Sequence, residues 1–207
     1  MKQYLTELIG TFFLTLVVAL SGGSDFAPLA IGAVLMVMVY AGGYLSGAHY
    51  NPAVSISVAL SRSFGKGTLR GYILAQLVGS ISALLIAQGL TGQSFSPATS
   101  DSIIFAPIIA EVLFTFALCY VILHTAVSKE SKGNSYYGLA IGGTLMLSVI
   151  AAGPISGAIL NPAIGTAAYI VSVLTGGAVT VEGLALSLIG PVVGAVLAAS
   201  VYGIQKS

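Results

Sequence analysis

Apolar residues fill long stretches of this chain, and polar or charged residues gather in the short segments between them. Six stretches are long enough for a membrane-spanning helix, which needs about 20 apolar residues: 4–22, 27–44, 69–91, 103–126, 135–153 and 182–204. Two shorter stretches, 52–60 and 162–174, each follow an Asn-Pro-Ala triplet. At ~1.5 Å per residue, the first of them covers only about half of a bilayer core. The pattern predicts an all-α membrane protein with six transmembrane helices and two re-entrant half-helices.

The two triplets end an internal repeat. Residues 29–53 and 139–163 are identical at 15 of 25 positions without a gap, and 5–16 resembles 109–120. A repeat of three spans reverses its direction in the membrane, so the second copy is expected to be inverted relative to the first. We expect a single transmembrane domain over 1–207, with inverted repeats at about 1–91 and 103–204.

Charge is scarce and one-sided. Only 6% of residues are charged and 57% are hydrophobic, whereas a soluble domain carries about 25% charged residues. The net charge of +1 argues against a nucleic-acid partner. The basic residues on one side of the six spans are Lys2, Arg62, Lys66, Arg70, Lys129, Lys132 and Lys206, and the acidic residues on the other are Asp25, Asp101 and Glu182. The positive-inside rule then predicts a multi-pass protein of the plasma membrane with both termini in the cytoplasm.

The chemistry of the triplets favours a pore. Proline suits the first turn of a helix, and the Asn side-chain oxygen before it can cap that helix. The Asn NH₂ group is then expected to face the pore as a donor, beside two helix N-termini that repel cations. Irregular backbone at this depth is tolerated only inside protein or along a wet cavity. We expect the pore midplane at Asn51, Pro52, Ala53, Asn161, Pro162 and Ala163.

Two acidic residues lie inside predicted spans, at Glu7 and Glu111. They are either proton-coupling carboxylates of a transporter or structural acceptors for the backbone before each half-helix, and their symmetric recurrence favours the structural interpretation. His49 is either a pH-sensitive pore residue or a residue that holds the loop in place. His124 is expected at the membrane interface. The spans offer no nucleophile–base pair and no cluster of metal ligands, so an enzyme, a cofactor and a metal site are not expected.

The motifs SGAHYNPAVS (46–55), TELIGTF (6–12), SGAILNPAI (156–164) and the pair Ala75-Gln76 resemble those of the aquaporin (major intrinsic protein) family, over essentially the whole chain. The resemblance implies six tilted helices with two half-helices, one pore per subunit, a homotetramer in the lipid bilayer, and passive conduction of water or small neutral solutes. It also implies that backbone carbonyls line the two half-pores, at Gly47, Ala48, His49, Tyr50, Gly157, Ile159 and Leu160.

The chain departs from the family at the narrow outer filter. The four filter positions of the family map to Ile31, Val149, Ala158 and Ile164, and the last of these is usually an Arg. Without the Arg, the filter lacks fixed hydrogen-bond donors and a positive charge. Partly apolar solutes such as glycerol or ammonia should be disfavoured less by this loss than water is. The predicted function is a passive channel for water, glycerol, ammonia or similar solutes. The alternatives are a closed, gated or structural membrane protein of the same fold, and a coupled transporter.

Overall fold

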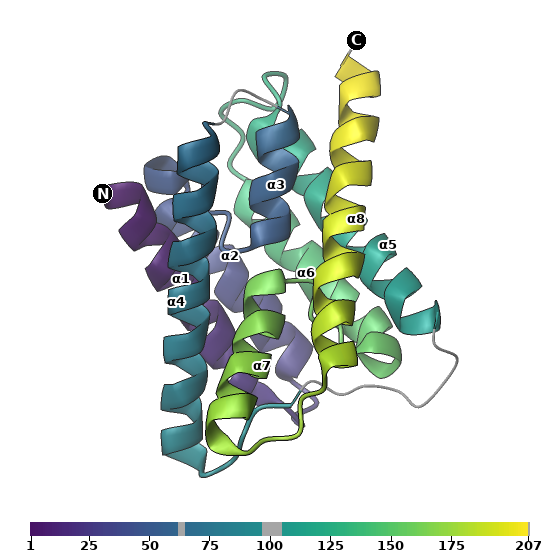
Figure 1. Cartoon of the computed structure of the whole chain (residues 1–207). Helices are drawn as coiled ribbons and strands as arrows, with labels where there is room; N and C mark the ends of the chain where they lie inside the picture. Colours follow the sequence, from purple (N-terminus) through teal and green to yellow (C-terminus); the bar gives the residue numbers. More distant parts are fainter. Residues whose placement is uncertain (62–64, 97–104, 207) are drawn as a thin grey trace.

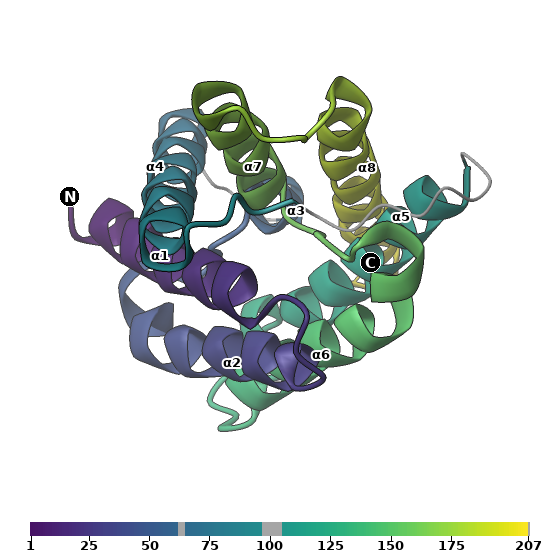
Figure 2. The ribbon, with the colours of Figure 1, turned by 90° about the horizontal axis from the view of Figure 1, so that it is seen from below.

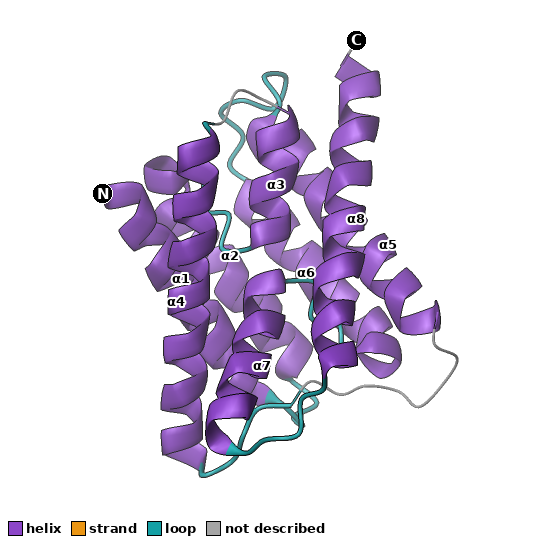
Figure 3. Ribbon diagram, viewed as in Figure 1, coloured by secondary structure: helices purple, strands orange, loops and turns teal. Residues whose placement is uncertain are grey.

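A computed structural model describes residues 1–61, 65–96 and 105–206 (Figure 1). The described residues form helices and loops without a strand (Figure 3). The helices are α1 (Lys2–Ser21), α2 (Ala27–Ser46), α3 (Pro52–Ser61), α4 (Lys66–Thr91), α5 (Phe105–Ile122), η1 (Leu123–Val127), α6 (Tyr137–Ser156), α7 (Pro162–Thr175) and α8 (Val181–Lys206).

The helices agree with the hydropathy pattern. Six are long and apolar enough to cross a membrane, and the two shorter ones, α3 and α7, begin at the prolines of the triplets. The main difference is at the end of α5, where the backbone widens into the π-helical turn η1 and the Ser128 N–H bonds to Leu123 O at 2.8 Å. This turn also carries contacts to the following loop, since the Asn134 amide donates to Thr125 O at 2.7 Å.

The repeat determines how the helices pair. Helix α1 packs against α4 as α5 packs against α8, and α2 packs against α6 at the junction of the halves (Figure 2). Glycines allow the closest approaches between paired helices, because a residue without a side chain lets two backbones come together. A Cβ on Gly79 would lie 2.5 Å from Leu8 O of α1, and one on Gly194 would lie 2.4 Å from Val112 O of α5.

The half-helices are arranged head to head in the interior. In Figure 1, α3 runs from the centre toward the top and α7 from the centre toward the bottom, so the two copies of the repeat have opposite directions. Helix α7 also lies between α4 and α8 (Figure 2). Outward-facing side chains such as Leu74, Leu113 and Leu147 are more than half exposed, as expected for a surface that faces lipid.

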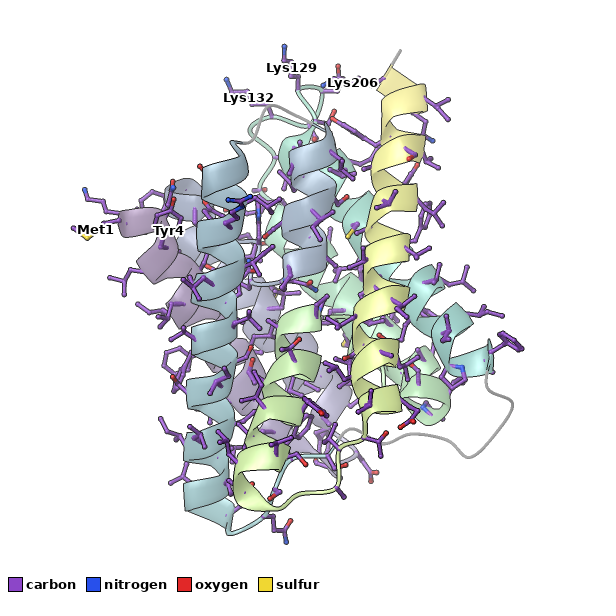
Figure 4. The ribbon with its side chains drawn as sticks, viewed as in Figure 1. Met1, Tyr4, Lys129, Lys132 and Lys206 are labelled. Carbon is purple, nitrogen blue, oxygen red and sulfur yellow. The ribbon has the colours of Figure 1, made fainter. Side chains whose placement is uncertain are left out.

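Four of the described charges can be placed at the two ends of the molecule. Lys129, Lys132 and Lys206 gather at one end of the molecule, at the top of Figure 4. Glu182 begins α8 at the opposite end. Arg62 and Asp101, which were also assigned to sides, lie outside the described residues.

Candidate functional site: a midplane asparagine pair and the cavity beside it

Both half-helices begin with an asparagine cap. The Ala53 N–H donates to Asn51 Oδ1 at 2.8 Å, and the Ala163 N–H donates to Asn161 Oδ1 at 3.0 Å. Pro52 and Pro162 occupy the first helical position, where no N–H is needed. The capping expected from the triplets is therefore present in both halves.

The asparagines also connect the two halves, which the sequence analysis did not anticipate. Asn51 Nδ2 donates to Leu160 O at 2.8 Å, and Asn161 Nδ2 donates to Tyr50 O at 3.0 Å. The amides were expected to be free, but a buried carbonyl at this depth needs a donor and the facing amide supplies one. An amide has two N–H groups, so each asparagine keeps one that no described residue engages.

The loops that lead into the half-helices have unusual backbone. The first re-entrant loop, residues 47–51, has φ of +52° at Ala48 and +50° at Tyr50. The second re-entrant loop, residues 157–161, has φ of +48° at Ala158 and +50° at Leu160. Such conformations cost a non-glycine residue about 1–3 kcal/mol each and persist only where the surroundings hold them. Their presence in pairs therefore requires strong external contacts.

Two buried carboxylates provide those contacts. The N–H groups of His49 and Tyr50 donate to Glu7 at 2.9 and 2.7 Å. In the second loop, Ile159 and Leu160 donate to Glu111 at 3.0 and 2.7 Å. Both carboxylates have no exposed surface. These are the bonds that a structural acceptor makes, because the carboxylate oxygens bind backbone N–H groups of the loops.

Further side chains complete this support, and sequence reasoning did not assign them a role. Ser46 donates to Glu7 and Ser156 donates to Glu111, both at 2.7 Å. These serines occupy matching positions of the internal repeat, and that identity was a usable signal. Gln76 donates to Glu7 at 2.8 Å from α4, and no spacing along the chain pointed to that bond.

A cavity of about 430 Å³ runs beside the asparagine pair. Both asparagines line it, as do all four predicted filter residues, Ile31, Val149, Ala158 and Ile164. Of the predicted pore-lining backbone, Ala48, His49, Gly157, Ile159 and Leu160 border the cavity, whereas Gly47 and Tyr50 are not among its lining residues. The structure adds the segment 93–96 between α4 and α5, which lines the cavity and had no sequence signal.

The filter positions are apolar and closely packed. Ile31, Ala158 and Ile164 are only 7%, 6% and 3% exposed, and Val149 is partly buried. No Asp, Glu, Lys or Arg is among the described residues that line the cavity. The four predicted filter residues present hydrocarbon to the cavity, whereas Asn51, Asn161 and His49 are polar residues in its lining.

The two histidines differ in setting. His49 lines the cavity, and its Nδ1 lies 3.0 Å from Ser55 Oγ. Both roles considered for His49 therefore stay open. His124 lies in η1, where Nδ1 is 2.8 Å from Tyr120 O and Nε2 is 2.9 Å from Gln205 Oε1. In the part of the chain that the structure describes, no three His, Cys, Asp or Glu residues gather as a metal site would require.

Comparisons with known proteins point in one direction. The family model of the major intrinsic proteins matches residues 1–202. Aquaporin NIP1-1 of Zea mays is 35% identical over 218 residues, which cover 99% of this chain and 75% of the maize protein. Nodulin-26 of Glycine max is 35% identical over 220 residues, which cover 100% of this chain and 78% of the soybean protein. The structure of the aquaglyceroporin from Plasmodium falciparum has the same fold, with a TM-score of 0.84 at 21% identity over 98% of this chain and 95% of that one.

Proposed function

Because the chain belongs to the major intrinsic protein family, whose members are channels rather than enzymes, we propose that it is a passive channel for water and small neutral solutes such as glycerol or ammonia. The observation that carries this proposal is the cavity beside the asparagine pair, where a buried polar midplane adjoins an apolar filter. The same fold supports a single domain over 1–207 with inverted repeats at about 1–91 and 103–204.

The asparagine pair supports a role as the midplane site of the pore. Each amide has one N–H bonded to the opposite loop and one N–H without a partner among the described residues. The second N–H can donate to a water or hydroxyl oxygen. The two helix N-termini that meet here each add a partial positive charge of about +0.5, which opposes cations. In this proposal the triplets bind neutral solutes and exclude cations together.

Backbone carbonyls are the acceptors that the proposal assigns to the two half-pores. The carbonyls of Tyr50 and Leu160 already accept from the asparagine amides. Of the remaining ones, those of Ala48 and of residues 157–159 belong to residues that border the cavity, and we assign these to solute protons. Glu7 and Glu111 act as structural supports of these loops, because each accepts two backbone N–H groups from its loop. This use of the carboxylates speaks against a proton-coupled transporter.

We assign the filter to Ile31, Val149, Ala158 and Ile164, all of which border the cavity. Aliphatic side chains cannot replace the hydrogen bonds of a hydrated solute, so solutes with fewer bonds to lose should pass more readily. The same burial favours a second candidate, a closed or gated channel of this fold. Ile164 at 3% exposure leaves little accessible surface at the position where the family usually carries Arg.

We place the protein in the plasma membrane as a homotetramer with both termini in the cytoplasm. The positive-inside rule supports the orientation, since Lys129, Lys132 and Lys206 gather at one end (Figure 4). Tetramers are usual in the family, and the exposed apolar faces of the long helices offer surface for both lipid and neighbouring subunits.

Stopped-flow light scattering on proteoliposomes tests the proposal. A sucrose challenge should shrink the vesicles faster than empty liposomes, and a glycerol challenge should give a faster reswelling phase. Asn161→Leu, which removes the amide donors, should return both rates to those of empty liposomes. If correctly assembled wild-type protein matches empty liposomes in both challenges, the open channel is refuted and the closed or gated candidate takes its place.

A further inference from the structure

The inverted repeat allows α4 and α8 to be compared residue by residue. Gly79 of α4 approaches Leu8 of α1, and Gly194 of α8 approaches Val112 of α5 in the same way. Leu8 and Val112 each follow one of the two buried carboxylates, Glu7 and Glu111. Gly79 and Gly194 are therefore equivalent. Counting back from them along each helix makes Gln76 equivalent to Pro191, and Tyr72 equivalent to Ser187.

The two carboxylates receive different numbers of hydrogen bonds. Glu7 accepts four, two on each oxygen, and the second bond to its Oε2 comes from Gln76. Glu111 accepts three among the described residues, and its Oε2 has only the bond from Leu160. Pro191, which stands where Gln76 would be, has no donor. Since a carboxylate oxygen can accept two hydrogen bonds, Glu111 Oε2 is one donor short among the residues that the structure describes.

The space that a donor would need is present beside Glu111. In the first half, Tyr72 fills the equivalent region and its hydroxyl donates to Ser46 O at 2.6 Å. In the second half, Ser187 is much smaller and donates within its own helix, to Leu184 O at 2.9 Å. A pocket of about 60 Å³ lies there, between the start of α8 and the second re-entrant loop, and Glu111, Ser156, Ser187 and Thr180 line it.

We propose that this Glu111 pocket is a binding site for a neutral hydrogen-bond donor of the size of water, either water or ammonia. The Ser187 hydroxyl donates to Leu184 O, and the Ser156 hydroxyl donates to Glu111 and accepts the Ala158 N–H at 3.1 Å. Both serines line the pocket, and because a hydroxyl oxygen has two lone pairs, each can accept one further hydrogen bond. Ser96 and Thr180 at the rim of the pocket are exposed, whereas Glu111, Ser156 and Ser187 are buried. A site with room and two to four polar partners can hold an ordered molecule. The volume of about 60 Å³ exceeds the roughly 10–15 Å³ of probe volume that one water needs.

The bound molecule connects to the midplane through a short chain of bonds. It supplies the second hydrogen bond of Glu111 Oε2, which also accepts the Leu160 N–H. The Leu160 carbonyl in turn accepts the Asn51 amide. The pocket shares Ser96 and Ile159 with the main cavity, so its occupant lies next to the apolar filter. The site follows from the fold and does not depend on whether the channel is open.

A high-resolution structure of the purified protein tests the site directly. We expect a density peak at hydrogen-bond distance from both Glu111 Oε2 and Ser187 Oγ. In Pro191→Gln, which supplies the amide that Gln76 gives to Glu7, the peak should vanish. The wild-type map decides the question even if this variant does not assemble. A dry wild-type pocket, with no peak on Glu111, would overturn the proposal.

Thermal unfolding distinguishes the two donors. The wild type and Pro191→Gln are melted in ammonium chloride and in sodium chloride at the same ionic strength and at pH 9, where part of the ammonium is ammonia. If ammonia competes for the site, the wild-type melting temperature rises by about 2 °C or more and that of the variant does not. Equal melting temperatures together with the density peak assign the site to water.

Discussion

The two re-entrant loops have the same backbone support but different side chains around it. In the first half, hydrogen bonds continue from Glu7 through Gln76 to Ser55, and Ser55 lies against the His49 ring. In the second half, Pro191 stands at the position of Gln76, Gly165 at that of Ser55, and Ile159 at that of His49. The first loop is thus embedded in a polar network, and the second is surrounded by apolar groups and a small pocket.

The comparison shows which contacts a re-entrant loop requires inside the membrane and which of them can vary. A loop that enters the bilayer core must pair its backbone N–H groups inside the protein, and Glu7 and Glu111 do this alike in both halves. The side chains beyond the carboxylates are under no such demand. They can diverge, and here the divergence gives one half more hydrogen bonds and the other half more space.

Removing the carboxylates is expected to have the largest effect on stability. Glu7→Ala leaves two buried N–H groups without an acceptor, at about 1–3 kcal/mol each, together with unpaired Ser46 and Gln76 donors. Glu111→Ala leaves three donors without an acceptor, one fewer than Glu7→Ala. Both variants should melt well below the wild type in detergent, and Glu7→Ala should be the worse. The isosteric Glu→Gln changes serve as controls, and equal losses in the two alanine variants would refute the difference between the halves.

The asparagine caps should behave alike in the two halves, because they make the same bonds. Asn51→Ala and Asn161→Ala each lose a cap, at about 1 kcal/mol, and a bond between the halves, at about another 1 kcal/mol. We expect similar decreases in unfolding free energy, measured by denaturant titration in micelles. The Asp variants keep the capping oxygen and lose only the donor, so they separate the two contributions. Unequal losses in the alanine pair would contradict the symmetry of the midplane.

The filter prediction concerns transport. Ile164→Arg restores the donors and charge that the family usually carries at this position. The ratio of glycerol to water permeability should fall by about tenfold, which corresponds to about 1.4 kcal/mol. Proteoliposome shrinkage and reswelling give both rates from one preparation. Ile164→Leu conserves volume and apolarity and should leave the ratio near that of the wild type. An unchanged ratio in Ile164→Arg would remove Ile164 from the filter.

The smallest expected effect compares Tyr72 with Ser187. Tyr72→Phe removes one buried hydrogen bond, to Ser46 O, and should destabilise the protein by about 1 kcal/mol. Ser187→Ala removes a bond within the same helix and one acceptor of the proposed Glu111 pocket, and its loss of stability should be smaller than that of Tyr72→Phe. Melting curves of the two variants against the wild type measure both. A larger loss for Ser187→Ala would mean that the second half depends on this hydroxyl more than its contacts indicate.

Much of the fold could be predicted from the chain. The six spans were located because each needs about 20 apolar residues in a row. The half-helices were located because Asn-Pro combines a capping side chain with a residue that starts helices. The predicted bounds differ from the observed ones by a few residues, and only the π-helical turn at Leu123–Val127 changes the type of a segment. These features depend on neighbouring residues, which a sequence displays directly.

The candidate site was predicted less completely. The triplets, the carboxylates and the four filter positions were predicted through the repeat and the family resemblance. The asparagines of the triplets and the four predicted filter residues border one cavity, whereas the prolines and alanines of the triplets and the two carboxylates are not among its lining residues. The roles of Gln76 and Tyr72 were not found. Neither was the contribution of residues 93–96 to the cavity. In the other half of the repeat, the positions of Gln76 and Tyr72 hold the unlike residues Pro191 and Ser187, so comparing the two halves did not single them out.

The sequence alone determined the number of spans and the position of the two half-helices, because hydropathy and capping act over a few residues along the chain. The tertiary structure decided how the halves meet. The bonds of Asn51 to Leu160 and of Asn161 to Tyr50 join residues about a hundred positions apart. Likewise, Ser187 stands in α8 where α4 has the larger Tyr72, and this difference in size leaves a pocket only because α8 is packed beside Glu111. Such contacts depend on the distances between helices, and those distances are established only when the helices pack.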